Sequence, residues 1–345
     1  MNMQAAIGGR AELRRQAEIC RNLGSPFVAS VLEAGSRQLP HAPYTEALIA
    51  AWPGDRASAA MAMRFNGALH ALARRATPPE LAALYRGDHE DFDGAIATAL
   101  ATGDRFIATW MRHPTQTNEV GRAAAILAAL MVVSRQVRMP FELLELGTSC
   151  GLNLNLARYA YNLGGVQAGA TDSPVRIVPE WRGPQPLYAP VDVVSAHGVD
   201  LHPLDATDPD ACERLLAFMW ADQHDRSVRL QQALELARRH PPRIDQADAL
   251  DWVKERLSTP QAAGLCRVVF HSMFKQYLGK QDQLTLTDEI VRAGEAATQD
   301  SPFACISLEW TPDRSEVQLA LTCWPDGETR FLATCHPYGS WVHWR

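Results

Sequence analysis

The sequence predicts an α/β fold: a doubly wound, mostly parallel sheet that ends in antiparallel strands and follows a helical segment. Through about residue 113, apolar residues recur at helical three-and-four spacing without a convincing strand. After Pro140, short β-rich runs alternate with helical ones, which is typical of a parallel sheet covered by helices. We therefore predict an α-helical cap over residues 1–115 and an α/β domain over residues 116–345.

The individual elements follow from these patterns. Helices are predicted at residues 10–23, 44–52, 56–75, 78–87, 91–112, 118–137, 211–239 and 284–297. Strands are predicted at residues 141–146, 191–201, 242–250, 266–274, 303–310, 317–324 and 329–336. Only TPDRS separates ISLEW from EVQLALTCW, so we expect a hairpin there, since a parallel crossover needs about a dozen residues or more.

Composition favours small-molecule chemistry. The chain has 33 basic and 39 acidic residues, a net charge of -6, and no basic footprint for nucleic acid or membrane. It shows neither a signal-peptide core nor an apolar run of about 18 residues, so a cytoplasmic location is expected. Seven cysteines without a CxxC pair predict reduced, mostly buried thiols, and no histidine has metal-ligand spacing.

The stretch ELGTSCG directly follows the first predicted strand. Gly147 and Gly151 would let a ligand approach the backbone of a strand-to-helix turn, where helix N-terminal amides supply donors. Glu145, at the strand end, would need a backbone amide or a ligand cation as partner. The spacing is not GxGxxG, so a nicotinamide-dependent dehydrogenase is disfavoured. A turn that binds no ligand is the alternative.

Acidic residues close the next two strands, and a histidine closes the fourth: Asp200, Asp248 and His271. In this order the motifs resemble the S-adenosylmethionine-dependent methyltransferase fold, whose first motif is acid-x-Gly-x-Gly-x-Gly. Ser149 stands where that family usually has its middle glycine. The resemblance implies a cofactor site built from Glu145, Gly147, Thr148, Gly151, Asn153, Asp200, Leu201, Asp248 and Ala249, with Asp200 on the ribose and Asp248 near the adenine.

A narrower resemblance covers nearly the whole chain. The motifs QTNEVGR, ELGTSCGLNLNLARYAY, DLHPLDATDP, MWADQHDR and VVFHSMFKQYL are similar to the bacterial family of unknown function DUF2332. That resemblance implies no established activity.

Two polar motifs are candidates for the substrate site. QTNEVGR contributes Gln116, Asn118 and Arg122, although Thr117 or Asn118 could simply cap the following helix. WADQHDR contributes Trp220, Gln223 and Arg226. It is expected mid-helix, where Asp222 and Arg226 could instead form an ordinary surface pair.

The resulting hypothesis is methyl transfer from S-adenosylmethionine to a small polar molecule, with S-adenosylhomocysteine as product. His271, Glu119 and Asp222 are the candidate proton acceptors, and His271 could equally be a structural histidine. The alternative is a catalytically inactive protein of the same fold that binds S-adenosylmethionine or a nucleotide in a regulatory role. Oligomeric state does not follow from the sequence.

Overall fold

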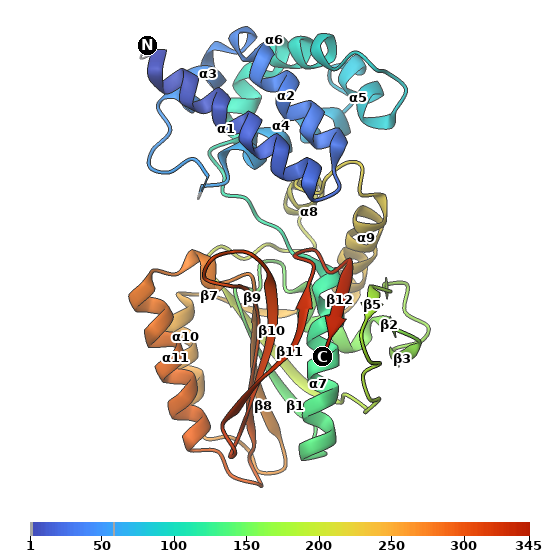
Figure 1. Ribbon diagram of the computed structural model, residues 1–345, viewed down its shortest axis with the longest axis vertical. Coiled ribbons are helices and arrows are strands. Elements are labelled where there is room, and N and C mark those ends of the chain that lie inside the picture. The colour runs from blue at the N-terminus through green and yellow to red at the C-terminus, as the bar shows by residue number, and fades with distance from the viewer. Residues whose placement is uncertain (1–2, 58) are drawn as a thin grey trace. The chain divides into compact units, whose positions relative to one another are not determined.

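A computed structural model describes residues 3–57 and 59–345, and the chain divides into two compact units (Figure 1). The helical unit takes in Met1–Thr117 and Pro209–Val228, and the sheet unit takes in Asn118–Asp208 and Arg229–Arg345. Sequence periodicity gives no sign that residues 209–228 return to the helical unit.

The helical unit confirms the predicted N-terminal helices. Four of its helices begin with proline, where the missing amide costs nothing. The sequence prediction missed the second helix. The elements are α1 (Met3–Asn22), α2 (Pro26–Gln38), η1 (Leu39–His41), α3 (Pro43–Ala50), α4 (Met61–Arg74), α5 (Pro79–Arg86), α6 (Phe92–Trp110) and α8 (Pro209–Ala217).

The helix predicted over residues 211–239 is wrong as a single element. The structure has α8, then α9 (His224–Arg239), and residues 218–223 between them are not helical. Within this break, the Asp222 carboxylate accepts hydrogen bonds from Ser25 Oγ and from the Phe27 amide at 3.1 Å, so it satisfies the start of α2. This tertiary demand outweighs the helical pattern of the segment.

The sheet unit contains a nine-stranded, mostly parallel sheet. Its order is β5-β12-β11-β10-β9-β8-β1-β6-β7. β1 pairs in parallel with β6 and β8, and parallel pairing continues to β7 and β9. The strands are β1 (Phe141–Leu146), β5 (Glu180–Arg182), β6 (Val193–Asp200), β7 (Arg243–Gln246), β8 (Cys266–Ser272), β9 (Phe303–Trp310), β10 (Val317–Trp324), β11 (Glu328–Cys335) and β12 (Trp341–Trp344).

The predicted antiparallel end of the sheet is confirmed. β9 and β10 pair antiparallel across the predicted hairpin, and the same pairing joins β10 to β11 and β11 to β12. Short connections force this arrangement, because they leave no room for a crossover helix.

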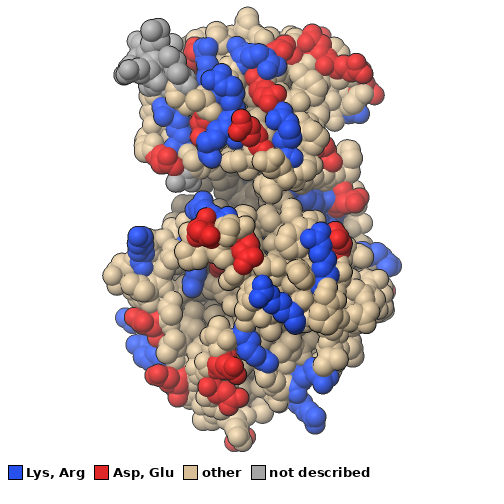
Figure 2. All heavy atoms as spheres, viewed as in Figure 1, with Lys and Arg blue, Asp and Glu red and all other residues tan. Residues whose placement is uncertain are grey.

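Helices cover both faces of this sheet (Figure 1). Helix α7 (Ala123–Val137) follows the short η2 (Val120–Arg122) and packs on β9, β10 and β11. Helices α10 (Ala249–Ser258) and α11 (Lys280–Glu295) pack together, with α10 on β6 and α11 on β9 and β10. The window Val120–Val137 is long and apolar enough to span a membrane, contrary to our expectation from sequence, but 78% of it is buried. Charged residues of both signs are interspersed on the face that Figure 2 shows.

The connection from β1 to β6 carries a small sheet in place of the expected helix. It begins with η3 (Leu152–Arg158) and continues through β2 (Ala160–Leu163), β3 (Val166–Gly169) and β4 (Arg176–Ile177), which pair in the order β3-β2-β4. The predicted helix after Gly151 is therefore wrong. Residues 152–156 of η3 are all buried, so the segment lacks the polar face of an ordinary surface helix.

Gly339 in the C-terminal loop packs closely against Gly121 in the segment before α7. A substitution at Gly339 therefore tests this packing. At φ +70°, a Cβ on Gly339 would lie 2.4 Å from the Gly121 carbonyl atoms. Gly339→Ala should therefore lower the free energy of unfolding by more than about 2 kcal/mol in a denaturant titration. Gly264→Ala is the matched control, because Gly264 has φ +80° with nothing within 4 Å. It should lose only about 1 kcal/mol, and equal losses would contradict the packing argument.

Candidate functional site

The turn after β1 is built from left-handed residues. Gly147, Ser149 and Gly151 have φ of +70°, +55° and +69°. Ser149 thus adopts the conformation that glycine would favour, at a cost of about 1–2 kcal/mol. Its amide donates a 2.8 Å hydrogen bond to Asp200 Oδ2, which offsets that cost. The turn is therefore formed without the middle glycine.

Side chains of the protein itself occupy the space beside both glycines. A Cβ on Gly147 would lie 2.5 Å from Cδ2 of Phe274, and one on Gly151 would lie 2.7 Å from Cβ of Pro242. Close approach therefore requires glycine at both positions, whereas the sequence suggested a ligand as the approaching group. The groups that approach are an aromatic ring and a proline.

Glu145 is buried beneath this turn. Thr148 Oγ1 donates a hydrogen bond to its Oε2, and Asn153 is a second hydrogen-bonding partner. Burial raises the pKa of Glu145 to about 8, although these two bonds oppose the shift. Glu145 is accordingly mostly protonated at neutral pH. Two buried polar atoms nearby, Ser149 Oγ and Asn153 Oδ1, have no hydrogen-bond partner.

Asp200 and Asp248 both lie where strands end, and both bind backbone amides. Asp200 Oδ1 accepts from the His202 amide at 2.9 Å, in addition to the bond from Ser149. Asp248 caps α10, with Oδ1 accepting from Leu250 N at 2.8 Å, and Ala249 is the first residue of that helix. Leu201, next to Asp200, is 59% exposed.

The segment 118–122 lies against the turn and the C-terminal loop. Asn118 Oδ1 accepts from Leu152 N at 2.8 Å, and Arg122 Nε donates to Pro337 O at 2.8 Å. Buried Glu119 accepts from Gly121 N at 3.0 Å and lies 3.9 Å from the Arg229 guanidinium. Glu119, not Thr117 or Asn118, is the residue that caps the helical turn η2.

The WADQHDR residues lie in the helical unit, as does Gln116, whereas Asn118, Glu119 and Arg122 lie in the sheet unit. A surface pair between Asp222 and Arg226 is the alternative to a substrate role, and the structure shows other partners: Arg226 Nη1 donates to Gln223 Oε1, while Asp222 accepts from the start of α2. Trp220 is buried in the break between α8 and α9. The shared substrate pocket stays a prediction.

His271 is the next-to-last residue of β8, near the strand end where the sequence placed it, and it is only 1% exposed. Its Nδ1 lies 2.6 Å from Glu309 Oε1, and Cys305 is a second neighbour that favours the protonated ring. Burial alone lowers the pKa of His271, but these two partners outweigh it and raise the pKa to about 9. Sequence reasoning missed Glu309 and Cys305, although the alternation in FACISLEW places both on one face of a strand.

Among residues 3–57 and 59–345, no group of three or more His, Cys, Asp or Glu side chains could hold a metal ion. Within the same residues, all seven cysteines are thiols, and only Cys305 and Cys323 are partly exposed.

Residues 10–344 match the model of a family described as "Uncharacterized protein conserved in bacteria (DUF2332)". No curated protein and no solved structure matches the chain.

The protonated state of Glu145 predicts an unusual pH dependence. The unfolded carboxyl ionises above its ordinary pKa of 4.5, whereas the folded one ionises near 8, so this group removes stability as the pH rises between those values. Glu145→Gln keeps the site neutral. Its Tm relative to wild type should therefore rise between about pH 5 and about pH 8. Glu328→Gln, at an exposed glutamate, should show no such rise, and parallel Tm curves for both variants would refute the assignment.

Proposed function

Because this chain belongs to the DUF2332 family, whose description names no activity, we propose from its residues that it is an S-adenosylmethionine-dependent methyltransferase of small polar molecules. The main support for this proposal is the set of residues at the carboxyl edge of the sheet. Five adjacent strands of the sheet, β7-β6-β1-β8-β9, are parallel. Numbered from one to five in chain order, they lie in the spatial order 3-2-1-4-5. Doubly wound sheets of this order bind nucleotides beyond the carboxyl ends of their strands. The turn at residues 147–151 and the Asp200 carboxylate lie at that edge.

Asp200 fits the ribose role that the resemblance implies. A carboxylate has about four acceptor positions, and the amides of Ser149 and His202 use two of them. Ribose hydroxyls could take the others while the turn stays in place. The unpartnered Ser149 Oγ is a further polar atom at the same turn.

The fit is incomplete at Gly147, because the Phe274 ring lies where a ligand would approach the backbone. Phe274 is partly exposed and follows β8, so cofactor binding requires this side chain to move. The same covering favours the alternative, a regulatory protein of this fold that binds a nucleotide without chemistry.

When bound, the cofactor supplies a methyl group on a sulfonium, and the residues of the chain would orient the acceptor and exclude water. His271 is a poor base at neutral pH because Glu309 and Cys305 stabilise its protonated ring. Asp222 holds the start of α2. Glu119 is therefore the candidate base within the sheet unit.

Binding is tested by thermal melting with S-adenosylhomocysteine, with NAD as the control ligand. A ligand that binds only the native state stabilises it by about 2.7 kcal/mol at 100 times its Kd. Asp200→Ala should abolish the shift, while Asp205→Ala, at a nearby loop aspartate, should retain it. A lack of any shift at millimolar S-adenosylhomocysteine would refute the proposal.

Phe274→Ala distinguishes two cases: a cofactor site at Gly147 that the Phe274 ring covers, and no cofactor site at Gly147. Removal of the ring from Gly147 should tighten S-adenosylhomocysteine binding about tenfold, since the ligand no longer has to displace a packed aromatic side chain. Titration calorimetry measures the change, and Phe303→Leu, in the core beneath α11, is the control for general loosening. Unchanged affinity in Phe274→Ala would place the ligand elsewhere.

A further inference from the structure

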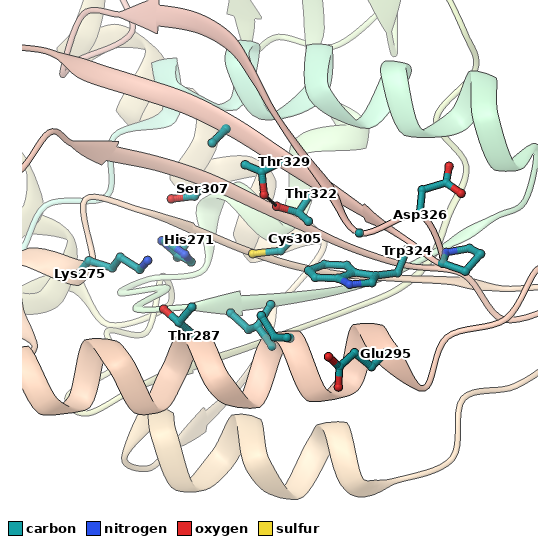
Figure 3. A pocket seen from close by; sticks show the side chains of 15 residues that line it. His271, Lys275, Thr287, Glu295, Cys305, Ser307, Thr322, Trp324, Asp326 and Thr329 are labelled. Carbon is teal, nitrogen blue, oxygen red and sulfur yellow. Dashed lines mark hydrogen bonds between the residues drawn. The ribbon is translucent and has the colours of Figure 1, made fainter.

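A pocket of about 680 Å³ opens between α11 and strands β8, β9, β10 and β11 (Figure 3). Its floor carries polar side chains from four adjacent strands, and Thr322 and Thr329 share a 2.8 Å hydrogen bond across it. Figure 3 shows Lys275 extending toward His271 at one end, with Trp324, Asp326 and Glu295 at the other. Its size suits a small organic ligand.

Three chemically matched side chains converge at the Lys275 end. In the sheet register, His271 pairs with Ser307, and Cys305 and Glu309 lie two residues to either side of Ser307. Side chains two residues apart on a strand share a face, so Cys305 and Glu309 flank the imidazole diagonally. Cys305 and His271 both line the pocket.

Glu309 fixes the imidazole. Its Oε1 accepts from His271 Nδ1 at 2.6 Å and also from the amides of Phe274 at 2.9 Å and Lys275 at 3.2 Å. Nδ1 is thereby committed to the carboxylate, which leaves Nε2 for the thiol. A nucleophile, a base and a group that orients the base form the arrangement found in cysteine and serine acyl-transfer enzymes.

We propose that Cys305 is the nucleophile of a second site, with His271 as its proton-transfer partner and Glu309 as a positioning residue, for small acyl esters or thioesters. This inference does not rest on the proposed methyl transfer, because none of these three residues belongs to the turn after β1.

The electrostatics suit a thiolate. Burial raises the pKa of Glu309, but the bonds to His271 and the two amides outweigh it, so that pKa is lowered overall. With the pKa of His271 near 9, the imidazole is protonated at neutral pH. An adjacent imidazolium favours the thiolate, which is the reactive form of cysteine.

The reaction balances without an added oxidant or cofactor. The Cys305 thiolate attacks the acyl carbon, a C–S bond forms, and the departing alcohol or thiol takes the proton of His271. Water then attacks the acyl-enzyme and gives one proton to His271, and the C–S bond breaks to release the carboxylic acid and the thiolate. The Lys275 ammonium at the same end could stabilise the oxyanion.

The substrate class follows from the rest of the lining. Hydroxyl groups of Ser307, Thr322 and Thr329 suit a polar acyl chain, and the Trp324 ring offers one apolar surface. Glu295 and Asp326 at the far end favour a cationic group, such as an amine, on the part of the substrate remote from the scissile bond.

The first test is acylation of the intact protein by p-nitrophenyl acetate, followed by peptide mass spectrometry. We expect a burst of p-nitrophenolate and one acetyl group on the Cys305 peptide, and at least about 100-fold slower acylation in Cys305→Ser. Cys323→Ser is the matched control, because Cys323 is the other partly exposed cysteine, and it should react as wild type does. Acetylation confined to any other residue would overturn the proposal.

The second test is the rate of alkylation by iodoacetamide at about pH 7. Wild type should react faster at Cys305 than His271→Gln does, and Glu309→Gln should react at an intermediate rate, because Glu309 holds the imidazole that assists the thiol. Equal rates in wild type and His271→Gln would refute the pairing of the thiol with the imidazole. If neither variant folds, peptide mass spectrometry of the wild type still decides, because labelling of Cys323 before Cys305 would overturn the proposal.

Discussion

The hydrogen bonds to Asp200 are the constraint on which the carboxyl edge of the sheet depends. Its carboxylate takes the Ser149 amide from the turn after β1 and the His202 amide from its own strand end. A bond to a charged group contributes about 1.5–3 kcal/mol, which is enough to offset the left-handed conformation of Ser149. With the turn fixed, Thr148 donates a hydrogen bond to the Glu145 carboxyl, and the Leu152 amide, just after the turn, donates to Asn118.

Regular strands could be predicted from sequence because their signal is local. The predicted strands at 141–146, 303–310 and 317–324 coincide with β1, β9 and β10, and the hairpin followed from loop length. The small sheet of residues 160–177 could not be predicted, since its strands are only two to four residues long. The site was harder for a different reason: His271 was identifiable at a strand end, but its partners Cys305 and Glu309 lie across the sheet and depend on register.

Phe274 adds to the free-energy cost of ligand binding at the turn after β1. Its ring fills the space beside Gly147, so a cofactor that reaches the backbone must expose or repack an aromatic side chain. Full exposure of such a side chain costs about 1.5–3 kcal/mol, comparable to the stabilisation expected from a ligand well above its Kd. The glycine motif alone therefore does not determine affinity; the residue opposite the glycine contributes as much.

The segment after β8 connects the two proposed sites physically. The Phe274 side chain covers Gly147, while the Phe274 and Lys275 amides bind the carboxylate that orients His271. Met273, just before them, has φ +57°, and Tyr277, two residues after Lys275, is 71% exposed. A single residue thus contributes its ring to the turn after β1 and its amide to the carboxylate that orients His271.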